Sequence, residues 1–221
     1  GLEGAWIAAR RGFRVILFEK QAVLGGQLNL AALAPGKKKI HWLLDSLTRR
    51  CQQAGVELHP GHAPTLDELN ALHPYAILDA TGGLPAVPAR IPGAQDSPLV
   101  CTPPDILTGK LQPTGEVIAV IGSGMTGLET AEILSAPEKD NAVLVVEAAP
   151  RLAPGVYGSN RNAVTAVLDQ NNAVCLTSRA LTKVGTDRIY LIDPQTGEEY
   201  TYPCQRVVLA LGTTPTKPYG E

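Results

Sequence analysis

The residues best suited to chemistry in this 221-residue sequence form a glycine-rich turn between two regular segments. Five apolar residues, 117–121, lead directly into the turn, and a helical pattern follows it without a break. The turn reads Gly122, Ser123, Gly124, Met125, Thr126 and Gly127. A continuous apolar run predicts a buried parallel strand. Glycines at the carboxyl end of such a strand allow a pyrophosphate to come close, and the N–H groups that open the next helix attract it.

The spacing within this fingerprint loop, residues 122–127, gives each glycine a separate task. Gly122 allows the tight turn, Gly124 the approach of phosphate, and Gly127 the packing of helix on strand. The next apolar run ends at Glu147, where the acid that binds a ribose hydroxyl is expected. The alternative is a strand-turn-helix whose glycines serve packing alone. The strand before, the helix after and the acid beyond favour a dinucleotide-binding site.

The start of the chain repeats the second part of this pattern. Gly1 opens a helical segment that ends at Gly12, and the buried strand that follows ends at Glu19. The glycine and the acid are 18 residues apart here, and 20 residues separate Gly127 from Glu147. The alignment predicts that Gly1 is the third glycine of an earlier fingerprint whose beginning precedes residue 1. We therefore expect this chain to be part of a longer protein.

The remaining pattern predicts two α/β units in tandem. In the first half, helical spacing covers 40–54, a capped helical turn begins at Thr65, and strands are expected at 56–59 and 75–80. Prolines and glycines without periodicity fill 84–115 and predict a connector. In the second half, we expect a helix at 162–170, short strands at 173–177, 181–184, 188–192 and 206–210, and a hairpin turn at 193–197.

Composition and charge exclude several classes of function. With 19 basic and 21 acidic residues, the net charge of −2 argues against nucleic-acid and anionic-membrane partners. No apolar run is long enough to span a membrane. The four cysteines are far apart and form no CxxC, which predicts free thiols in a reducing cytoplasm. The four histidines lack the spacing of metal ligands, so we predict no metal site.

Several segments together resemble a known family. The most discriminating are LFEK at 17–20 and LGGQLN at 24–29; the others are 1–3, 34–37, 78–82, 122–132, 145–147 and 208–212. The chain resembles the two-dinucleotide-binding module of pyridine nucleotide–disulfide oxidoreductase fold. More closely, it is similar to the carboxyl-terminal reductase module of the 2,4-dienoyl-CoA reductase group, the NADH:flavin oxidoreductases with an old-yellow-enzyme barrel in front. The resemblance covers essentially the whole chain.

The resemblance implies an α/β fold of two tandem Rossmann-like, three-layer dinucleotide-binding units, the first incomplete. Residues 1–93 would be a partial FAD-binding half, 94–114 a connector, and 115–221 the NAD(P)H-binding half. Glu19 would bind the adenosine ribose of FAD, with Lys20 beside it. The residues implied to lie at FAD are Gly1, Glu19, Lys20, Gly25, Gly26, Gln27, Ala80, Thr81 and Gly82.

In the second half, the resemblance implies that the fingerprint loop holds the NAD(P)H pyrophosphate and Glu147 the ribose. Hydride would pass from the nicotinamide to the flavin, so the cofactors supply the chemistry and we nominate no acid–base residue. Glu129, on the helix after the loop, either faces the nicotinamide or is a solvated helix residue.

The chain departs from the family pattern at both ends. The first fingerprint is incomplete, and the second FAD contact expected after Glu221 is absent. The barrel that would carry FMN and an iron–sulfur cluster is also absent. We therefore expect FAD in the intact protein and weak FAD binding by this piece, whereas the NAD(P)H fingerprint is whole. The lack of CxxC argues against a member similar to thioredoxin reductase.

Coenzyme choice is expected to follow from charge. Glu147 would repel a 2′-phosphate, which favours NADH, although Arg151 could shift the preference towards NADPH. Two functions stay open at this point. The chain is either a catalytic module that passes hydride from NAD(P)H to FAD, or a non-catalytic module that holds an adenine nucleotide as a structural element.

Overall fold

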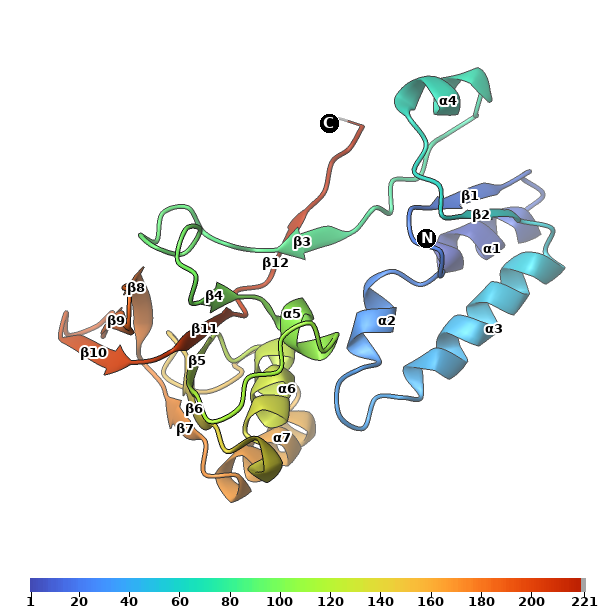
Figure 1. Cartoon of the computed structure of the whole chain (residues 1–221). Helices are drawn as coiled ribbons and strands as arrows, with labels where there is room; N and C mark the ends of the chain where they lie inside the picture. Colours follow the sequence, from blue (N-terminus) through green and yellow to red (C-terminus); the bar gives the residue numbers. More distant parts are fainter. Residues whose placement is uncertain (220–221) are drawn as a thin grey trace. The chain divides into compact units, whose positions relative to one another are not determined.

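The structure is a computed structural model that describes residues 1–219. The chain divides into two compact units (Figure 1). Unit 1 contains Gly1–Gly83 and the described residues from Pro215 onward, and unit 2 contains Leu84–Thr214. Two short strands, β3 (Gly83–Pro85) and β12 (Thr213–Pro215), pair where the chain crosses from one unit to the other.

Unit 2 is built on a five-stranded parallel sheet. Its strands, in order across the sheet, are β4 (Val100–Cys101), β11 (Arg206–Leu209), β5 (Val117–Ile121), β6 (Ala142–Val146) and β7 (Val174–Leu176). The register sets Val120 opposite both Val145 and Val208. These three side chains are completely buried, as expected for the central strands of a sheet covered on both faces.

Different elements cover the two faces of this sheet (Figure 1). One face carries the helices α5 (Pro103–Leu107), α6 (Met125–Leu134) and α7 (Gly158–Gln170). A short 3₁₀ helix, η1 (Pro137–Lys139), follows α6. The other face carries an antiparallel sheet of β8 (Ala180–Val184), β9 (Arg188–Ile192) and β10 (Glu199–Pro203).

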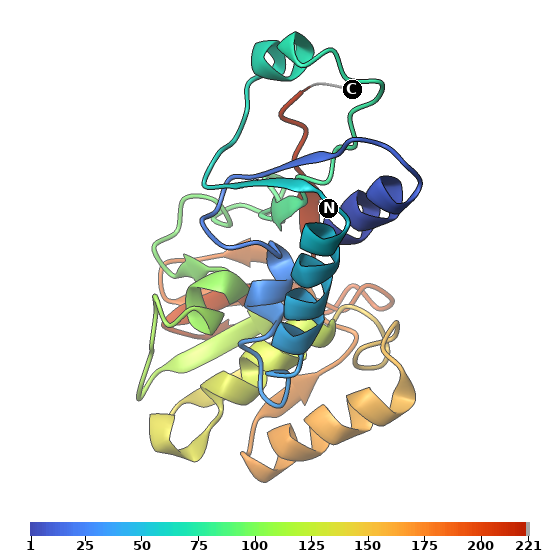
Figure 2. The same cartoon turned by 90° about the vertical axis from the view of Figure 1, so that its right-hand side faces the viewer.

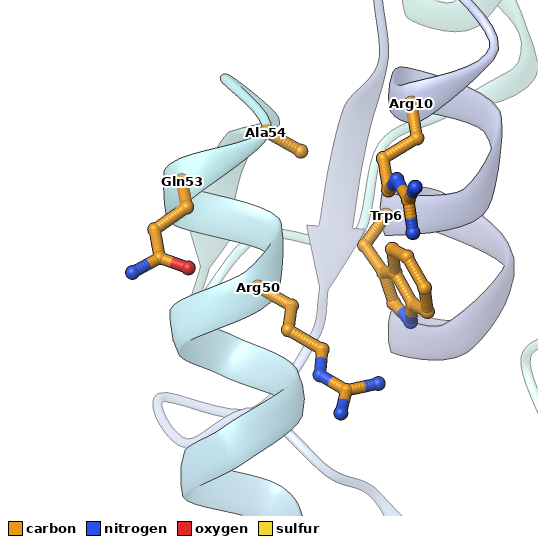
Figure 3. Close-up of a pocket in the computed structure, with 5 residues that line it drawn as sticks. All are labelled: Trp6, Arg10, Arg50, Gln53 and Ala54. Atoms are coloured by element: carbon orange, nitrogen blue, oxygen red, sulfur yellow. The ribbon is translucent and has the colours of Figure 1, made fainter.

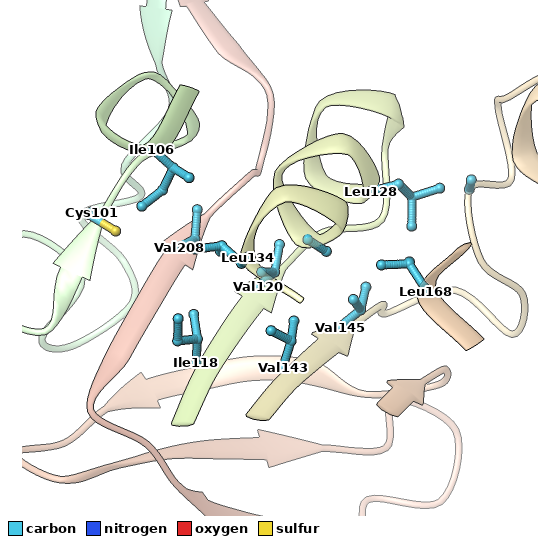
Figure 4. Packing of buried hydrophobic residues seen from close by; sticks show 12 residues of the cluster. Cys101, Ile106, Ile118, Val120, Leu128, Leu134, Val143, Val145, Leu168 and Val208 are labelled. Atoms are coloured by element: carbon cyan, nitrogen blue, oxygen red, sulfur yellow. The ribbon is translucent and has the colours of Figure 1, made fainter. Parts of the chain in front are cut away.

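The core of unit 2 accordingly has two parts. Ile118 and Val120 of β5 pack towards the helices, against Leu128 of α6 (Figure 4). Ala119 and Ile121 alternate to the opposite face and pack against the antiparallel sheet. Burial on both faces makes β5 a rigid base for the loop at its carboxyl end.

Unit 1 contains a smaller parallel ladder of β1 (Ile16–Glu19) and β2 (Glu57–Pro60). Its helices are α1 (Leu2–Arg10), α2 (Gln27–Ala31), α3 (Ile40–Gln53) and α4 (Leu66–Ala71). Helices α1 and α3 lie side by side next to the ladder (Figures 1 and 2) and bury Leu2, Leu47 and Cys51 between them. Helix α4 begins with a reciprocal capping box between Thr65 and Glu68.

The predicted α/β class and most of the predicted elements are confirmed, but the strand expected at 75–80 is wrong. The structure assigns no strand there, and the side chains of Tyr75 and Leu78 are 92% and 72% exposed. A buried parallel strand needs a hydrogen-bonded neighbour, and within the described residues β1 pairs with β2 alone. The segment has the composition of a strand, but in the part of the chain that the structure describes it has no neighbouring strand with which to pair.

The segment 94–114 is also different from the connector that its prolines and glycines predict. It contains β4, which pairs with β11 at the edge of the sheet, and α5, which a Thr102–Asp105 capping box initiates. Pro103 occupies the first turn of α5, where a missing N–H costs nothing. Contacts assign residues 84–114 to unit 2. The limits of the FAD and NAD(P)H halves at 93 and 115 stay predictions.

Candidate functional site

The fingerprint loop lies at the carboxyl ends of three adjacent strands. Gly122 N donates to Val146 O of β6 at 2.8 Å, and Ala210 N, after β11, donates to Ile121 O of β5 at 2.8 Å. Strand β5 lies between β6, which follows it in the chain, and β11, which comes much later in the sequence. In open parallel sheets, ligands bind in the crevice at such a switch point.

The glycines of the loop meet different surroundings. A Cβ on Gly122, whose φ is +99°, would stand 2.5 Å from Ala210 O, and a Cβ on Gly127 would collide with Gly122 O. Neither position has room for a side chain. Gly124 is the opposite case, because it is exposed and a Cβ there would meet nothing within 4 Å.

The open side of Gly124 coincides with the start of a helix. Gly124 is the N-cap residue of the ten-residue α6, and no side chain caps this end. The first N–H groups of a helix have no acceptor within the helix, so they are available to an anion. Thr126 is exposed on this first turn and Met125 is half-buried beside it. The loop therefore fits the pyrophosphate of a dinucleotide.

Glu147 follows β6 and lies against the loop. Its Oε2 accepts hydrogen bonds from Ser123 N at 3.0 Å and Ser123 Oγ at 2.5 Å, and its Oε1 accepts from Ala149 N at 2.8 Å. Burial alone would raise the pKa of Glu147, but the hydrogen bonds from Ser123 and Ala149 outweigh it and lower the pKa below the ordinary glutamate value. The group beside the loop is thus an ionised carboxylate, which fits a ribose hydroxyl as a hydrogen-bond acceptor.

Glu129 is buried in the second turn of α6, with only 5% of its surface exposed. Its alternative placement as a solvated helix residue is therefore wrong. Burial, reinforced by the charge of Glu129, raises the pKa of Glu132 one turn later. An orientation of Glu129 towards a nicotinamide stays a prediction.

Unit 1 brings part of the predicted FAD set together. Gln27 Nε2 donates to Gly83 O at 2.8 Å and lies 3.9 Å from the position of a Cβ on Gly82. Gly26 is the N-cap residue of α2 with φ +50°, and a Cβ there would meet nothing within 4 Å. Gly25, with φ +118°, is packed against Leu44. The chain around 25–27 and the chain around 82 therefore share one region of unit 1.

The other predicted FAD residues are spread over the same unit. Gly1 caps α1 without a side-chain hydrogen bond, and a Cβ on it would lie 3.9 Å from Ala80 Cβ. Thr81 is exposed and hydrogen-bonds Thr216 through its hydroxyl. Glu19 ends β1 and accepts from Gln21 N at 2.9 Å, and Lys20 beside it is exposed.

Two surface hollows lie away from the fingerprint loop. One, of about 390 Å³, is in unit 1, where Arg10 and Arg50 flank Trp6 at the ends of α1 and α3 (Figure 3). The other, of about 370 Å³, is in unit 2 and includes Arg151 and Arg161 among its lining residues. Neither has a lining residue from the loop, so we base the site on the loop geometry and not on cavity size.

Sequence reasoning missed two contributions to the site. Ala210 forms the opposite wall of the loop, since its Cβ and its carbonyl border Gly127 and Gly122. The signal was present, because a small residue followed shortly by Gly212 ends this strand as Ala80 and Gly82 end the corresponding run of unit 1. The role of the Ser123 side chain had no such signal.

The comparisons with known proteins agree with this geometry. A family model described as pyridine nucleotide-disulphide oxidoreductase matches residues 1–219. The chain belongs to this family of flavoprotein oxidoreductases. The family predicted from the sequence is thereby confirmed, and so is its α/β dinucleotide-binding fold.

Individual relatives are considerably longer than this chain. An NADH oxidase of Thermoanaerobacter brockii is 34% identical over 97% of this chain and 33% of its own length. A bilirubin reductase of Mediterraneibacter gnavus is 31% identical over 97% of this chain and 32% of its own length. A solved 2-naphthoyl-CoA reductase complex superposes with a TM-score of 0.82 at 25% identity, over 96% of this chain and 31% of that one. The chain spans about a third of the length of these relatives.

No helix among the described residues is both long enough and apolar enough to cross a membrane. Residues 1–219 also contain no group of three or more His, Cys, Asp or Glu side chains arranged to hold a metal ion.

Proposed function

We propose that unit 2 binds NAD(P)H, with NADH preferred, at the fingerprint loop. The observation that carries this proposal is the exposed N-terminus of α6 at Gly124, next to a carboxylate that the loop itself holds ionised. The N–H groups of the first turn would bind the pyrophosphate. Glu147 would accept a ribose hydroxyl and disfavour the added charge of a 2′-phosphate.

We further propose that unit 1 is the FAD-binding half and that NADH supplies hydride, which FAD accepts when both are bound. Family membership supports this role, because the family consists of oxidoreductases. In unit 1, Gly26 and Gln27 would border the flavin side, and Glu19 would hold the ribose. The protein's contribution is to bind, orient and exclude water; no side chain is assigned a proton-transfer step.

The relatives extend well beyond the matched region, and this supports a further part of the proposal. We propose that electrons pass onward to a substrate-reducing barrel in the same protein, carrying FMN and an iron–sulfur cluster, in the cytoplasm. We propose dinucleotides and this barrel as partners, and the net charge of −2 disfavours nucleic acid or an anionic membrane.

Calorimetric titration of the chain with NADH and NADPH tests the coenzyme site. Glu147→Ala removes the ribose acceptor, so it is expected to weaken NADH binding about tenfold and NADPH binding less. The matched control is Glu138→Ala, which removes the same charge from the exposed η1 helix and should leave both affinities unchanged. A larger loss for NADPH than for NADH in Glu147→Ala would refute the assignment.

Rapid mixing of the intact, FAD-loaded protein with NADH without oxygen tests the hydride step. Loss of the flavin absorbance is expected. Tight binding of ADP with no bleaching by NADH would instead support a structural nucleotide and contradict the catalytic role.

A further inference from the structure

Ser123 differs from the other residues of the fingerprint loop because its side chain is completely buried in polar contacts. It is 0% exposed, although it lies between the half-buried Gly122 and the exposed Gly124. Its hydroxyl donates to Glu147 Oε2 at 2.5 Å and accepts from Ala153 N at 2.7 Å. One hydroxyl therefore joins the loop after β5, the acid after β6 and the segment that follows this acid.

These contacts determine which oxygen of the Glu147 carboxylate Ser123 holds. Each carboxylate oxygen accepts about two hydrogen bonds. Ser123 N and Ser123 Oγ together fill Oε2. Ala149 N donates to Oε1, and the Ala148 N–H also helps to lower the pKa of this carboxyl group. Both bonds from Ser123 therefore fall on Oε2, and they fix the orientation of the carboxylate about its side-chain torsions.

The same hydroxyl also anchors the segment that carries Arg151. We call the hydrogen-bonded group of Ser123 and Glu147 the clamp. Ala149 N is bonded to Glu147 and Ala153 N to Ser123, so the chain on both sides of Arg151 is bonded to the clamp. Ala153 is 0% exposed and has φ +45°, a backbone conformation unusual for alanine. Arg151 itself donates to Pro154 O at 3.2 Å within this segment. Loss of the Ser123 hydroxyl would release Ala153 N and remove one of the two bonds to Oε2, which loosens the arginine-bearing segment and the carboxylate together.

We propose that the Ser123 hydroxyl is a positioning residue that sets the preference of this site for NADH over NADPH, by fixing Glu147 and the segment 149–153. This inference rests on the proposed function, because it deepens the coenzyme choice of the same site. A fixed, ionised carboxylate opposes a 2′-phosphate, whereas a mobile carboxylate next to a mobile arginine opposes it less.

The test is the ratio of the NADPH and NADH dissociation constants, measured by calorimetry on the 221-residue chain. Ser123→Ala is expected to lower this ratio about fivefold or more. The matched control is Ser135→Ala, because Ser135, the C-cap residue of α6, is also buried but contacts Asn171 and the carbonyl of Glu132, away from Glu147. This control should leave the ratio unchanged, which separates positioning from a general loss of stability.

A double-mutant cycle shows whether Ser123 acts through Glu147. In a Glu147→Ala background, Ser123→Ala is expected to change the ratio no further. If Ser123→Ala lowers the ratio equally in both backgrounds, or leaves it unchanged in the wild-type background, the inference is overturned while the proposed function stands. If the folded wild-type chain binds neither coenzyme, or prefers NADPH, the proposed NADH site and the inference fail together.

A measurement on the wild-type chain covers the case in which Ser123→Ala does not fold. The ¹³C shift of the Glu147 carboxyl group, followed by NMR against pH, reports the hydrogen bonds that it accepts. We expect a midpoint below the ordinary glutamate range. A midpoint within or above that range would show that the clamp is not formed and would overturn the inference.

Discussion

Substitutions at Gly124 and Gly127 should separate the effect of a residue on ligand binding from its effect on folding. A methyl group on Gly127 would collide with Gly122 O, whereas one on Gly124 would point into open space. Gly127→Ala is therefore expected to destabilise the fold by about 2–3 kcal/mol, the usual cost of overpacking. Gly124→Ala should cost less than about 1 kcal/mol, the difference between alanine and glycine at an N-cap.

The order should reverse for ligand binding: among folded proteins, Gly124→Ala should lose more NADH affinity than Gly127→Ala. In Gly124→Ala the methyl group occupies the approach to the first turn of α6, so NADH affinity should fall while the urea unfolding curve hardly moves. Unchanged NADH affinity in a folded Gly124→Ala chain would contradict the placement of the pyrophosphate.

Glu147 also makes a pH-dependent contribution to stability. Its folded-state pKa is lowered, so the contribution is present above the unfolded-state pKa and is lost as pH falls through the folded-state value. Glu147→Gln should destabilise the chain by about 1–2 kcal/mol near pH 7, because an amide accepts fewer of the bonds from Ser123 and Ala149. Urea unfolding at decreasing pH should show this difference shrinking below about pH 4. A difference that grows on acidification would contradict the lowered pKa.

At the level of secondary structure, an ion pair connects the strand on which the loop is built to its neighbour. Arg206, at the start of β11, donates to both carboxylate oxygens of Glu116, just before β5, at 2.8 and 2.9 Å. Both side chains are mostly buried. Glu116→Gln should therefore lower the free energy of unfolding by about 1–2 kcal/mol, since it weakens a paired, bidentate contact.

The control for this prediction is an exposed pair with similar geometry. Asp187 and Arg188 form a two-point contact at the surface, at 2.9 and 3.1 Å. Asp187→Asn should change stability by less than about 0.5 kcal/mol, because exposed ion pairs contribute little. Equal effects of the two substitutions would show that burial of the Arg206 pair adds nothing.

The sequence pattern correctly predicted the strands and helices whose burial follows from their own residues. The apolar runs of β5, β6 and β11 and the helical spacing of α3 lie at the predicted places because each is buried through its own composition. The run at 75–80 and the strand β4 show the limit. Whether a segment pairs depends on a neighbour elsewhere in the chain, so the mostly apolar segment 75–80 stays unpaired while the two-residue β4 joins the sheet.

At the scale of the whole molecule, the sequence predicted the arrangement of the site better than its details. Gly122, Gly124 and Gly127 have the separate roles that their spacing predicts, because backbone geometry fixes those roles. The contacts of Ser123 with Ala153 could not be predicted, since they join residues 30 positions apart through a loop with no regular pattern. The division of the chain at β3 and β12 depends in the same way on contacts distant in sequence.

The central claim is that the fingerprint loop of unit 2 is an NAD(P)H-binding site. Titration of the ¹⁵N-labelled chain with NADH, followed by amide NMR shifts, tests it most directly. The account predicts that the largest shift changes fall on the amides of the fingerprint loop and of Glu147, and that Gly124→Ala needs more NADH to produce them. Changes centred elsewhere, or none at saturating NADH in a folded sample, would contradict it.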